Sequence, residues 1–567
     1  MSIDIPHALT ENTDYEPLKA KQSRYGHEIT LRPEDLTDGM LAAISAACRA
    51  DLSDEKKTKR VVDAIIAARE GDTKKKIPNL HAAPEMIMGL LRNNISDGWI
   101  YQRREHGHLA AWLVTSVKYN PGTNNGPPYV SMSMTANGRT SGSRGGEKAL
   151  GLVTTSQTFY SDSITNKRVV DMLTNAGLYV ETDELRAEYD RGLAKYVNVL
   201  ADGFSEQYRY TGTPAIDGYD RDREGLREGH KVIHDINRTE AKAPSDFTKS
   251  VLFLPINAEL AERAAQDEDV DPGTGAIPTH FDLRVFDLHV HDFIWVNTND
   301  IERYVYDKTL TEKIVLPEDQ RNLLDILTSG LDNFTGDVVE GKSAGNVILC
   351  KGAPGVGKTL TAEVYSEVIE RPLYSIHSGN LGVSADDVRK NLETAFKRAK
   401  RWNAVLLLDE ADVFVLERGN NITQNAIVAE FLRTLEYFTG LMFMTTNRAD
   451  NIDDAILSRA AAIIDYKVPG TKDIRAIWQV QATNQGTVLS NDLLDELVYG
   501  FKTITPRDVK MLLRLALRVS AGTDTRLNAD VFASCAMFRG LHFEPGSREE
   551  DAAVAPRRIR KKVVDKG

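Results

Sequence analysis

The sequence has few cysteines and no long apolar run. Its 567 residues include only Cys48, Cys350 and Cys535, which are too few and too widely separated for a disulfide framework. No stretch approaches the ~18–20 consecutive apolar residues that a membrane-spanning helix needs. The polar, acidic N-terminus also lacks the basic and apolar segments of a secretory signal. We therefore expect a cytoplasmic protein that makes no use of a membrane.

Positive charge is not in excess either. The 82 acidic residues outnumber the 70 lysines and arginines, which gives a formal net charge of −12. This balance disfavours indiscriminate coating of nucleic acid, although a local basic patch can still bind it. The composition, 41% hydrophobic and 27% charged, is that of a globular protein, and the length predicts several domains.

The first 305 residues show a mixed pattern of helices and strands. Apolar residues recur at helical spacing from Glu34 to Arg69 and over Glu184–Leu200, whereas Tyr129–Thr135 alternates apolar and polar residues as a strand does. We predict a mixed α+β region at 1–305, with up to two subdomains.

From about Lys308 short β-branched strands alternate with amphipathic helices, which is typical of an α/β domain with a parallel sheet. The predicted strands are Asn346–Cys350, Pro372–His377, Ala404–Asp409, Leu441–Thr446 and Ala462–Val468. After Pro469 the pattern is helical to about Ser520. We predict an α/β domain of the P-loop NTPase class at 306–470, a helical lid at 471–545 and a basic, disordered tail at 546–567.

The strongest motif has the form G-x-x-x-x-G-K-[ST]. It consists of Gly352, Ala353, Pro354, Gly355, Val356, Gly357, Lys358 and Thr359, and the helix that it opens continues at Leu360. Glycines let backbone N–H groups surround phosphate oxygens at the positive N-terminus of a helix. The lysine brings a full charge to the β- and γ-phosphates, and the threonine hydroxyl ligates Mg²⁺. Because a strand precedes the motif and a helix follows it, we predict a site for ATP and Mg²⁺ rather than a chance match.

Acidic and amide side chains follow two further predicted strands. Asp409 would bind the phosphates through Mg²⁺ and its water shell, and Glu410 would polarise the attacking water. Asn447 ends another strand, where it could orient the same water. Acidic residues often end buried strands without any catalytic role, so this assignment depends on the phosphate-binding motif that precedes it.

Taken in order, the segments GAPGVGKT, LLLDEAD, MTTNRAD and DAILSR resemble the motifs of the AAA family of ATPases. The resemblance covers about Lys308–Ser520 and is to members with one AAA module after a long N-terminal region. It implies that Asp409 and Glu410 are the Walker B pair and that Asn447 is sensor 1.

The resemblance also implies that identical subunits assemble into a ring, and the expected ring is a hexamer. Arg459 falls where the family has an arginine finger, which reaches the γ-phosphate bound by the next subunit. Arg507 falls on sensor 2 of the lid. We expect residues 1–305 to recognise a client, meaning the protein on which ATP hydrolysis acts. Without the resemblance, both arginines would be interpreted as solvated surface residues.

Two departures from the family pattern bear on the mechanism. Ala460, Ala461 and Ala462 follow Arg459, where a second arginine is usual, so the finger would consist of one residue. The first pore loop, Ser378–Val383, lacks the aromatic residue of members that thread polypeptide. We therefore expect a milder remodelling of the client.

Candidate metal ligands occur outside the ATPase region. Asp287, His289 and His291 alternate along a predicted strand and would share one face, as zinc ligands can. A polar outer strand face has the same pattern. His230 and His234 have helical spacing but lack the glutamate of a zincin motif.

Two basic segments leave other functions open. Arg139 and Arg144 lie in a predicted Gly-rich loop, and Pro556–Lys562 carries five positive charges in seven residues. Either segment could bind nucleic acid, and either could be solvated and without function. The alternatives to protein remodelling are a nucleic-acid-directed ATPase, such as a loader or a replication or recombination accessory, and a nucleotide-switched scaffold.

Overall fold

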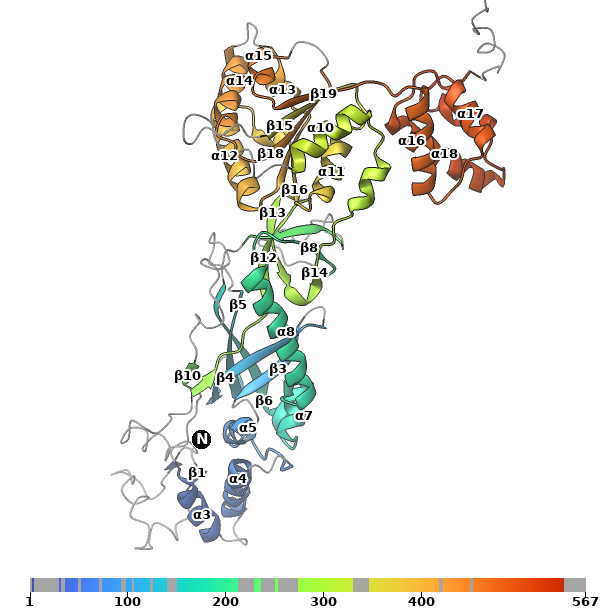
Figure 1. The fold of residues 1–567 in the computed structure, drawn as a ribbon. Coiled ribbons are helices and arrows are strands. Elements are labelled where there is room, and N and C mark those ends of the chain that lie inside the picture. Colours follow the sequence, from blue (N-terminus) through green and yellow to red (C-terminus); the bar gives the residue numbers. More distant parts are fainter. Residues whose placement is uncertain are drawn as a thin grey trace, which may run out of the picture. The chain divides into compact units, whose positions relative to one another are not determined.

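The computed structural model divides the chain into two compact units, Met1–Arg303 and Tyr304–Gly567 (Figure 1). The structure describes residues 3–4, 30–31, 36–48, 53–70, 74–92, 98–104, 107–122, 126–139, 150–212, 229–235, 250–252, 274–329, 346–417, 422–448 and 452–544. Among these residues no helix has both the length and the apolar character for crossing a membrane. The domain limits proposed from the sequence stay predictions.

The first unit begins with a short strand pair, β1 (Ile3–Asp4) and β2 (Thr30–Leu31), and three of its helices, within 38–69 and at 183–202, lie where the periodicity predicted helices. The helices are α3 (Asp38–Ala47), α4 (Ser53–Arg69), α5 (Ala83–Arg92), α6 (Ser161–Ile164), α7 (Val169–Asn175) and α8 (Asp183–Asp202). Thr37 and Thr182 begin α3 and α8, because each side-chain oxygen accepts a backbone N–H of the first turn.

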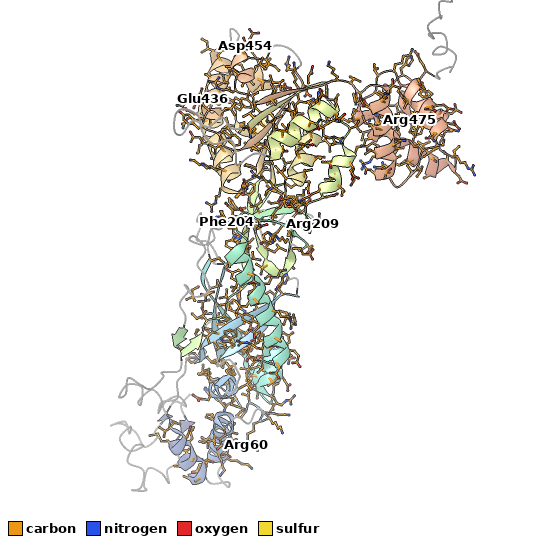
Figure 2. All side chains as sticks on the ribbon, viewed as in Figure 1. Arg60, Phe204, Arg209, Glu436, Asp454 and Arg475 are labelled. Carbon is orange, nitrogen blue, oxygen red and sulfur yellow. The ribbon has the colours of Figure 1, made fainter. Side chains whose placement is uncertain are left out.

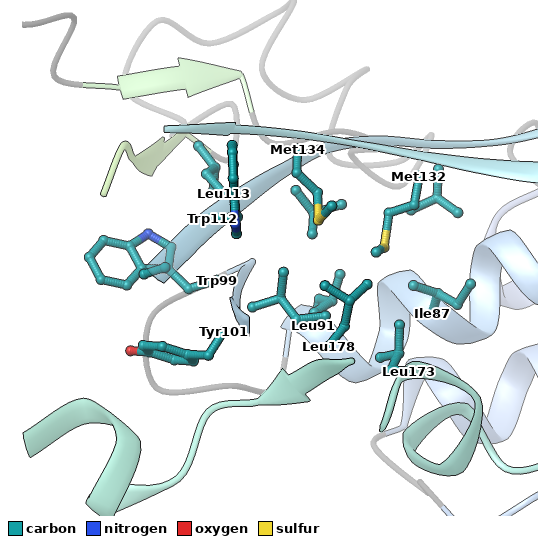
Figure 3. Packing of buried hydrophobic residues seen from close by; sticks show 14 of the residues in the cluster. Ile87, Leu91, Trp99, Tyr101, Trp112, Leu113, Met132, Met134, Leu173 and Leu178 are labelled. Carbon is teal, nitrogen blue, oxygen red and sulfur yellow. The ribbon is translucent and has the colours of Figure 1, made fainter. Parts of the chain in front are cut away.

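An antiparallel five-stranded sheet follows, in the order β6-β5-β4-β3-β7. Its strands are β3 (Trp99–Arg103), β4 (Leu109–Asn120), β5 (Tyr129–Arg139), β6 (Leu150–Tyr160) and β7 (Leu178–Val180). One core joins these strands to α5 and α7 (Figure 3). Its members include Ile87, Leu91, Trp99, Tyr101, Trp112, Leu113, Met132, Met134, Leu173 and Leu178.

A second antiparallel sheet of the first unit has the order β13-β12-β9-β8-β14. Its strands are β8 (Gln207–Tyr210), β9 (Lys231–His234), β12 (Asp282–Asp287), β13 (Asp292–Asn297) and β14 (Ile301–Arg303). A separate pair joins β10 (Ser250–Leu252) to β11 (Thr274–Ala276). The 3-10 turn η4 (Thr298–Asp300) links β13 to β14.

The expected strand face of Asp287, His289 and His291 is wrong. Asp287 ends β12, while both histidines lie in the turn before β13. The buried carboxylate of Asp287 accepts the backbone N–H of His289 at 2.7 Å, so it stabilises the turn. His230 precedes β9 and His234 is the last residue of that strand, so neither lies on a helix. No group of three or more potential metal ligands occurs in the described part of the chain.

The second unit contains the parallel sheet that the sequence predicted, and its order is β16-β17-β18-β15-β19. The strands are β15 (Asn346–Gly352), β16 (Leu373–His377), β17 (Val405–Asp409), β18 (Leu441–Thr446) and β19 (Ala462–Tyr466). The α-helices of this part are α10 (Glu318–Ser329), α11 (Lys358–Val368), α12 (Ala385–Arg401), α13 (Asp412–Val415), α14 (Ile422–Leu435) and α15 (Asp454–Leu457). Two 3-10 helices, η5 (Lys308–Lys313) and η6 (Ser378–Leu381), complete it. Because β18 lies between β15 and β17, the carboxyl ends of these three strands are adjacent.

The helical lid forms its own core within the second unit. It contains α16 (Thr471–Asn484), α17 (Asn491–Gly500), α18 (Pro506–Thr523) and α19 (Ala529–Met537), the last of which begins beyond the predicted helical end at Ser520. Trp478, fully buried, packs against Phe501 and Phe532 at its centre. The lid is therefore a packed body rather than a set of loose helices.

Candidate functional site

The loop between β15 and α11 needs glycine at specific positions. Gly352 has φ 145°, and a Cβ there would lie 2.3 Å from the carbonyl oxygen of Tyr466 on β19. Gly355 and Gly357 have φ 83° and 111°, a region that side chains disfavour. Gly357 also begins α11, so the positive end of this helix faces the loop. This is the backbone arrangement that binds phosphate.

The Lys358 ammonium makes three hydrogen bonds at the start of α11. It donates to the carbonyl oxygens of Gly352 and Ala353, both at 2.8 Å, and to Oδ1 of Asn447 at 3.0 Å. Burial lowers the pKa of Lys358, an effect that the carboxylates of Asp412 and Asp409 oppose. A buried charge with fixed partners is held where the motif places the β- and γ-phosphates.

Asp409, at the end of β17, accepts hydrogen bonds from two hydroxyl groups. Its Oδ1 accepts hydrogen bonds from Thr359 Oγ1 at 2.9 Å and from Thr445 Oγ1 at 2.5 Å. A carboxylate and a hydroxyl are the oxygen ligands that Mg²⁺ takes in phosphate sites, so Thr359 and Asp409 fit this ion. The geometry brings together two residues that lie 50 positions apart.

Glu410 has an unusual backbone at the end of the same strand. Its φ is 53°, a left-handed conformation, and its N–H donates to Thr445 Oγ1 at 3.0 Å. Its side chain is exposed, in contrast to the half-buried Asp409. Strained non-glycine residues cluster at functional sites. The left-handed backbone at Glu410 turns its carboxylate toward solvent, whereas the carboxylate of Asp409 points to the two threonine hydroxyls.

Asp412 is a site residue that the sequence reasoning did not single out. Its Oδ1 accepts the Asn447 N–H at 2.9 Å and the Thr446 hydroxyl at 2.5 Å. Asn447 in turn accepts from Lys358 through its own side chain. Asp412 therefore links the turn after β17 to the residue that accepts a hydrogen bond from Lys358. The sequence signal that could have identified Asp412 is its place as the last residue of the segment LLLDEAD, three positions after Asp409.

The helices of the predicted lid contact the loop between β15 and α11 through Arg507. Its backbone N–H donates to the Gly355 carbonyl oxygen at 3.1 Å, and a Cβ on Gly355 would lie 2.9 Å from the Cβ of Arg507. Thr505 caps α18 at this point by accepting the Asp508 N–H at 3.2 Å. The positive charge of Arg507 contributes to lowering the pKa of Lys358. Within one chain the structure thus brings Arg507 to the phosphate loop.

The chain matches a known family over this part. The model of the ATPase family associated with various cellular activities (AAA) matches residues 348–468. These residues form an AAA domain. Similar proteins include the ATP-dependent zinc metalloprotease FtsH of Ureaplasma parvum, 31% identical over 151 residues, which are 24% of this chain and 20% of that protein.

Two more relatives are similar over comparable stretches. A putative 26S proteasome regulatory subunit homolog of Methanothermobacter marburgensis is 27% identical over 226 residues, 37% of this chain and 57% of the relative. The human ATPase family gene 2 protein homolog B is 28% identical over 170 residues, 27% of this chain and 22% of the relative. The chain therefore spans from a fifth to just over half of the length of these relatives.

Arg459 is not part of the cluster at the AAA phosphate loop. It follows α15, and its guanidinium pairs with the carboxylate of Glu436, a residue marked in Figure 2, and donates to the Ala455 carbonyl oxygen at 3.0 Å. The family resemblance predicts that this residue acts in the site of a neighbouring subunit. A single chain does not test that prediction.

The remaining predicted residues differ in exposure. Ala353 and Pro354 are exposed on the loop, Val356 is buried in the core beneath it, and Leu360 is 42% exposed. Arg139 ends β5 instead of lying in a loop. Arg144 and the tail 546–567 lie outside the described residues.

Proposed function

We propose that the chain is a Mg²⁺-dependent ATPase that assembles into a ring of six subunits. This ring remodels a protein client in the cytoplasm. The observation that supports the ATPase part is the hydrogen bonding of Thr359 to Asp409 and of Lys358 to Asn447, which fits a pair of metal ligands beside a pair of phosphate-binding residues. The AAA match over 348–468 supports the same conclusion.

The proposed roles of the residues rest on this geometry and, for Asn447 and Arg459, on the resemblance to the AAA family. Lys358 and the backbone of the loop bind the phosphates, while Thr359 and Asp409 would hold Mg²⁺, which offsets phosphate charge when bound. The Glu410 carboxylate accepts the proton of the attacking water. Asn447 orients that water. Arg459 of one subunit would stabilise the charge that develops in the next subunit's site.

Protein remodelling is favoured by the relatives and by the pore loop. The names of the relatives include a protease and a proteasome regulatory subunit homolog, both directed at proteins. Ser378–Leu381 forms η6, and Val383 beyond it is 87% exposed, so the predicted pore loop presents an aliphatic side chain. An aliphatic contact grips a chain less firmly than an aromatic one, which supports mild remodelling over forceful threading.

Phosphate release tests the proposal with two matched variants. Wild-type protein should hydrolyse ATP only with Mg²⁺, and β-casein, which lacks a stable fold, should stimulate it. Lys358→Ala should lose ATP binding, whereas Glu410→Gln should bind ATP and hydrolyse it at least about a hundredfold more slowly. Wild-type turnover in Glu410→Gln would show that another residue activates water. ATP affinity retained by Lys358→Ala would overturn the site itself.

A further inference from the structure

The edge strand β6 of the first sheet is long, and none of the described residues gives it a common form of edge protection. β6 pairs with β5 over an unbroken register from Leu150↔Arg139 to Tyr160↔Tyr129, without a bulge. Its sequence, LGLVTTSQTFY, contains no charge and no proline. Natural edge strands are usually shortened, charged, bulged or covered, because their free backbone groups recruit other strands. The opposite edge, β7, has only 3 residues.

The hydrogen bonds of Asn137 establish which β6 groups point outward. Its N–H donates to Pro278 O at 2.8 Å, and its carbonyl accepts from His280 at 2.7 Å, both on the side away from β6. Leu152 lies opposite Asn137 in the ladder. In an antiparallel pair both residues then direct their backbone groups away from each other. Leu152 therefore presents its N–H and C=O at the open edge.

Alternation extends this conclusion along the strand. Thr154 and Ser156 also present their N–H and C=O outward, since every second residue of a strand has the same orientation. No described residue bonds to the outward groups of Leu152, Thr154 or Ser156. The open part ends at Thr158, whose carbonyl accepts a 3.4 Å bond from Gln157.

The side chains around this edge are neutral and small. Leu152, Thr154 and Ser156 are exposed, Leu152 to 50%, while the next residue along, Val153, packs toward the core. An added strand would thus meet hydroxyl and aliphatic groups and no charge from these three residues. Recognition there depends on backbone hydrogen bonds and selects little on sequence.

We propose that the β6 edge binds an extended segment of the protein client by adding it as a sixth strand of the sheet. This rests on the proposed remodelling function and identifies what the first unit recognises: an extended, unfolded stretch of polypeptide, largely irrespective of its sequence. A second copy of the chain fits less well. Antiparallel pairing of two β6 edges needs a twofold axis, whereas the proposed ring joins its subunits by head-to-tail contacts.

Proline at an outward N–H position provides a selective test. Thr154→Pro deletes one donor of the open edge and leaves the β5 ladder intact, because proline is tolerated on edge strands whose N–H faces solvent. Thr154→Val keeps the N–H and the side-chain shape. The probe is a fluorescent peptide with the sequence of Leu150–Tyr160, flanked by lysines for solubility. We expect Thr154→Pro to bind it about tenfold more weakly than wild type, and Thr154→Val to match wild type.

Hydrogen exchange gives a readout that does not depend on any variant. With β-casein bound, the amides of Leu152, Thr154 and Ser156 should exchange more slowly, while that of Thr155, already bonded within the sheet, should not change. Slow exchange of the three amides in the free protein would show that the edge is already covered and would overturn the proposal. A change of oligomeric state in Thr154→Pro would show that copies of the chain pair there, which also overturns it.

Stimulation of ATP turnover separates the two proposals. If β-casein stimulates wild type and Thr154→Pro equally, remodelling stands and the β6 site is wrong. If β-casein neither binds wild type nor stimulates it, the remodelling function itself fails. Stimulation lost in Thr154→Pro and kept in Thr154→Val supports both proposals.

Discussion

Arg459 and Glu436 allow the ring proposal to be tested by two substitutions with different expectations. The two side chains form an ion pair and are 31% and 33% exposed. A pair this accessible to solvent contributes about 0–1 kcal/mol, because water and salt screen it. An arginine finger contributes ~10³–10⁵ in rate, which is about 4–7 kcal/mol. Releasing Arg459 toward a neighbouring site therefore costs little compared with what the finger contributes.

We expect Arg459→Ala to keep ATP binding and to lose at least about a thousandfold in turnover. Glu436→Gln should change turnover by less than about fivefold, since only the exposed ion pair is lost. Phosphate release at saturating ATP measures turnover, and a fluorescent ATP analogue measures binding. With Ala460, Ala461 and Ala462 next in sequence, no nearby arginine can replace the finger.

Equal losses in the two variants would refute this reasoning, because they would mean that turnover needs the ion pair itself. Mixed rings give an independent check. When Arg459→Ala and Lys358→Ala subunits are combined, some sites pair an intact Lys358 with a neighbour's intact Arg459, and activity should return. No rescue, with subunit exchange confirmed, would show that Arg459 does not act between subunits.

Three further predictions concern the site and the first unit. Asp412→Ala should lower kcat about tenfold with KM within about twofold, because the backbone N–H of Asn447 loses the side-chain oxygen that accepts it. Asp412→Asn should keep most activity. Steady-state kinetics measures both, and equal loss in the two variants would contradict the positioning role. Gly352→Ala should destabilise the second unit by about 1–3 kcal/mol in denaturant unfolding, since its Cβ would clash with Tyr466, and an unchanged midpoint would contradict the clash. Burial lowers the pKa of His280 from 6.5 to about 4. Between these two pH values the unfolded chain is protonated at this residue while the folded chain is not, so the first unit should lose stability as the pH falls from 6.5 toward 4. Thermal melts should show a flatter pH dependence in His280→Gln.

The nucleotide-binding fold was predictable because phosphate chemistry restricts both residue type and spacing. Glycines at 352, 355 and 357 followed by Lys358 fit few backbones other than a strand, a curled loop and a helix, and all three occur in the structure. The parallel strands were predictable for a related reason: a strand buried on both faces is a continuous apolar run, as Val405 to Leu408 is in β17 before Asp409 ends the strand.

Contacts between distant loops were not predictable from such patterns. Asp412 bonds to Asn447, 35 positions away, and neither residue type nor local periodicity indicates this partner. The turn at His289 and His291 was missed because alternating polarity is the same in a strand and in a hairpin that reverses within it. The periodicity of a sequence shows which residues share one face of a helix or strand, but it does not show where the chain turns.

The connection between the lid and the phosphate loop is made by backbone as well as by charge. Arg507 donates its N–H to the Gly355 carbonyl oxygen, a bond that every substitution at 507 except proline can keep. The lid helices share one core, so a displacement of Gly355 reaches the lid as a whole through the start of α18. The guanidinium can add a response to phosphate charge at the same point. Nucleotide state would thus reach the lid by two routes, one mechanical and one electrostatic, and only the second depends on which residue stands at 507.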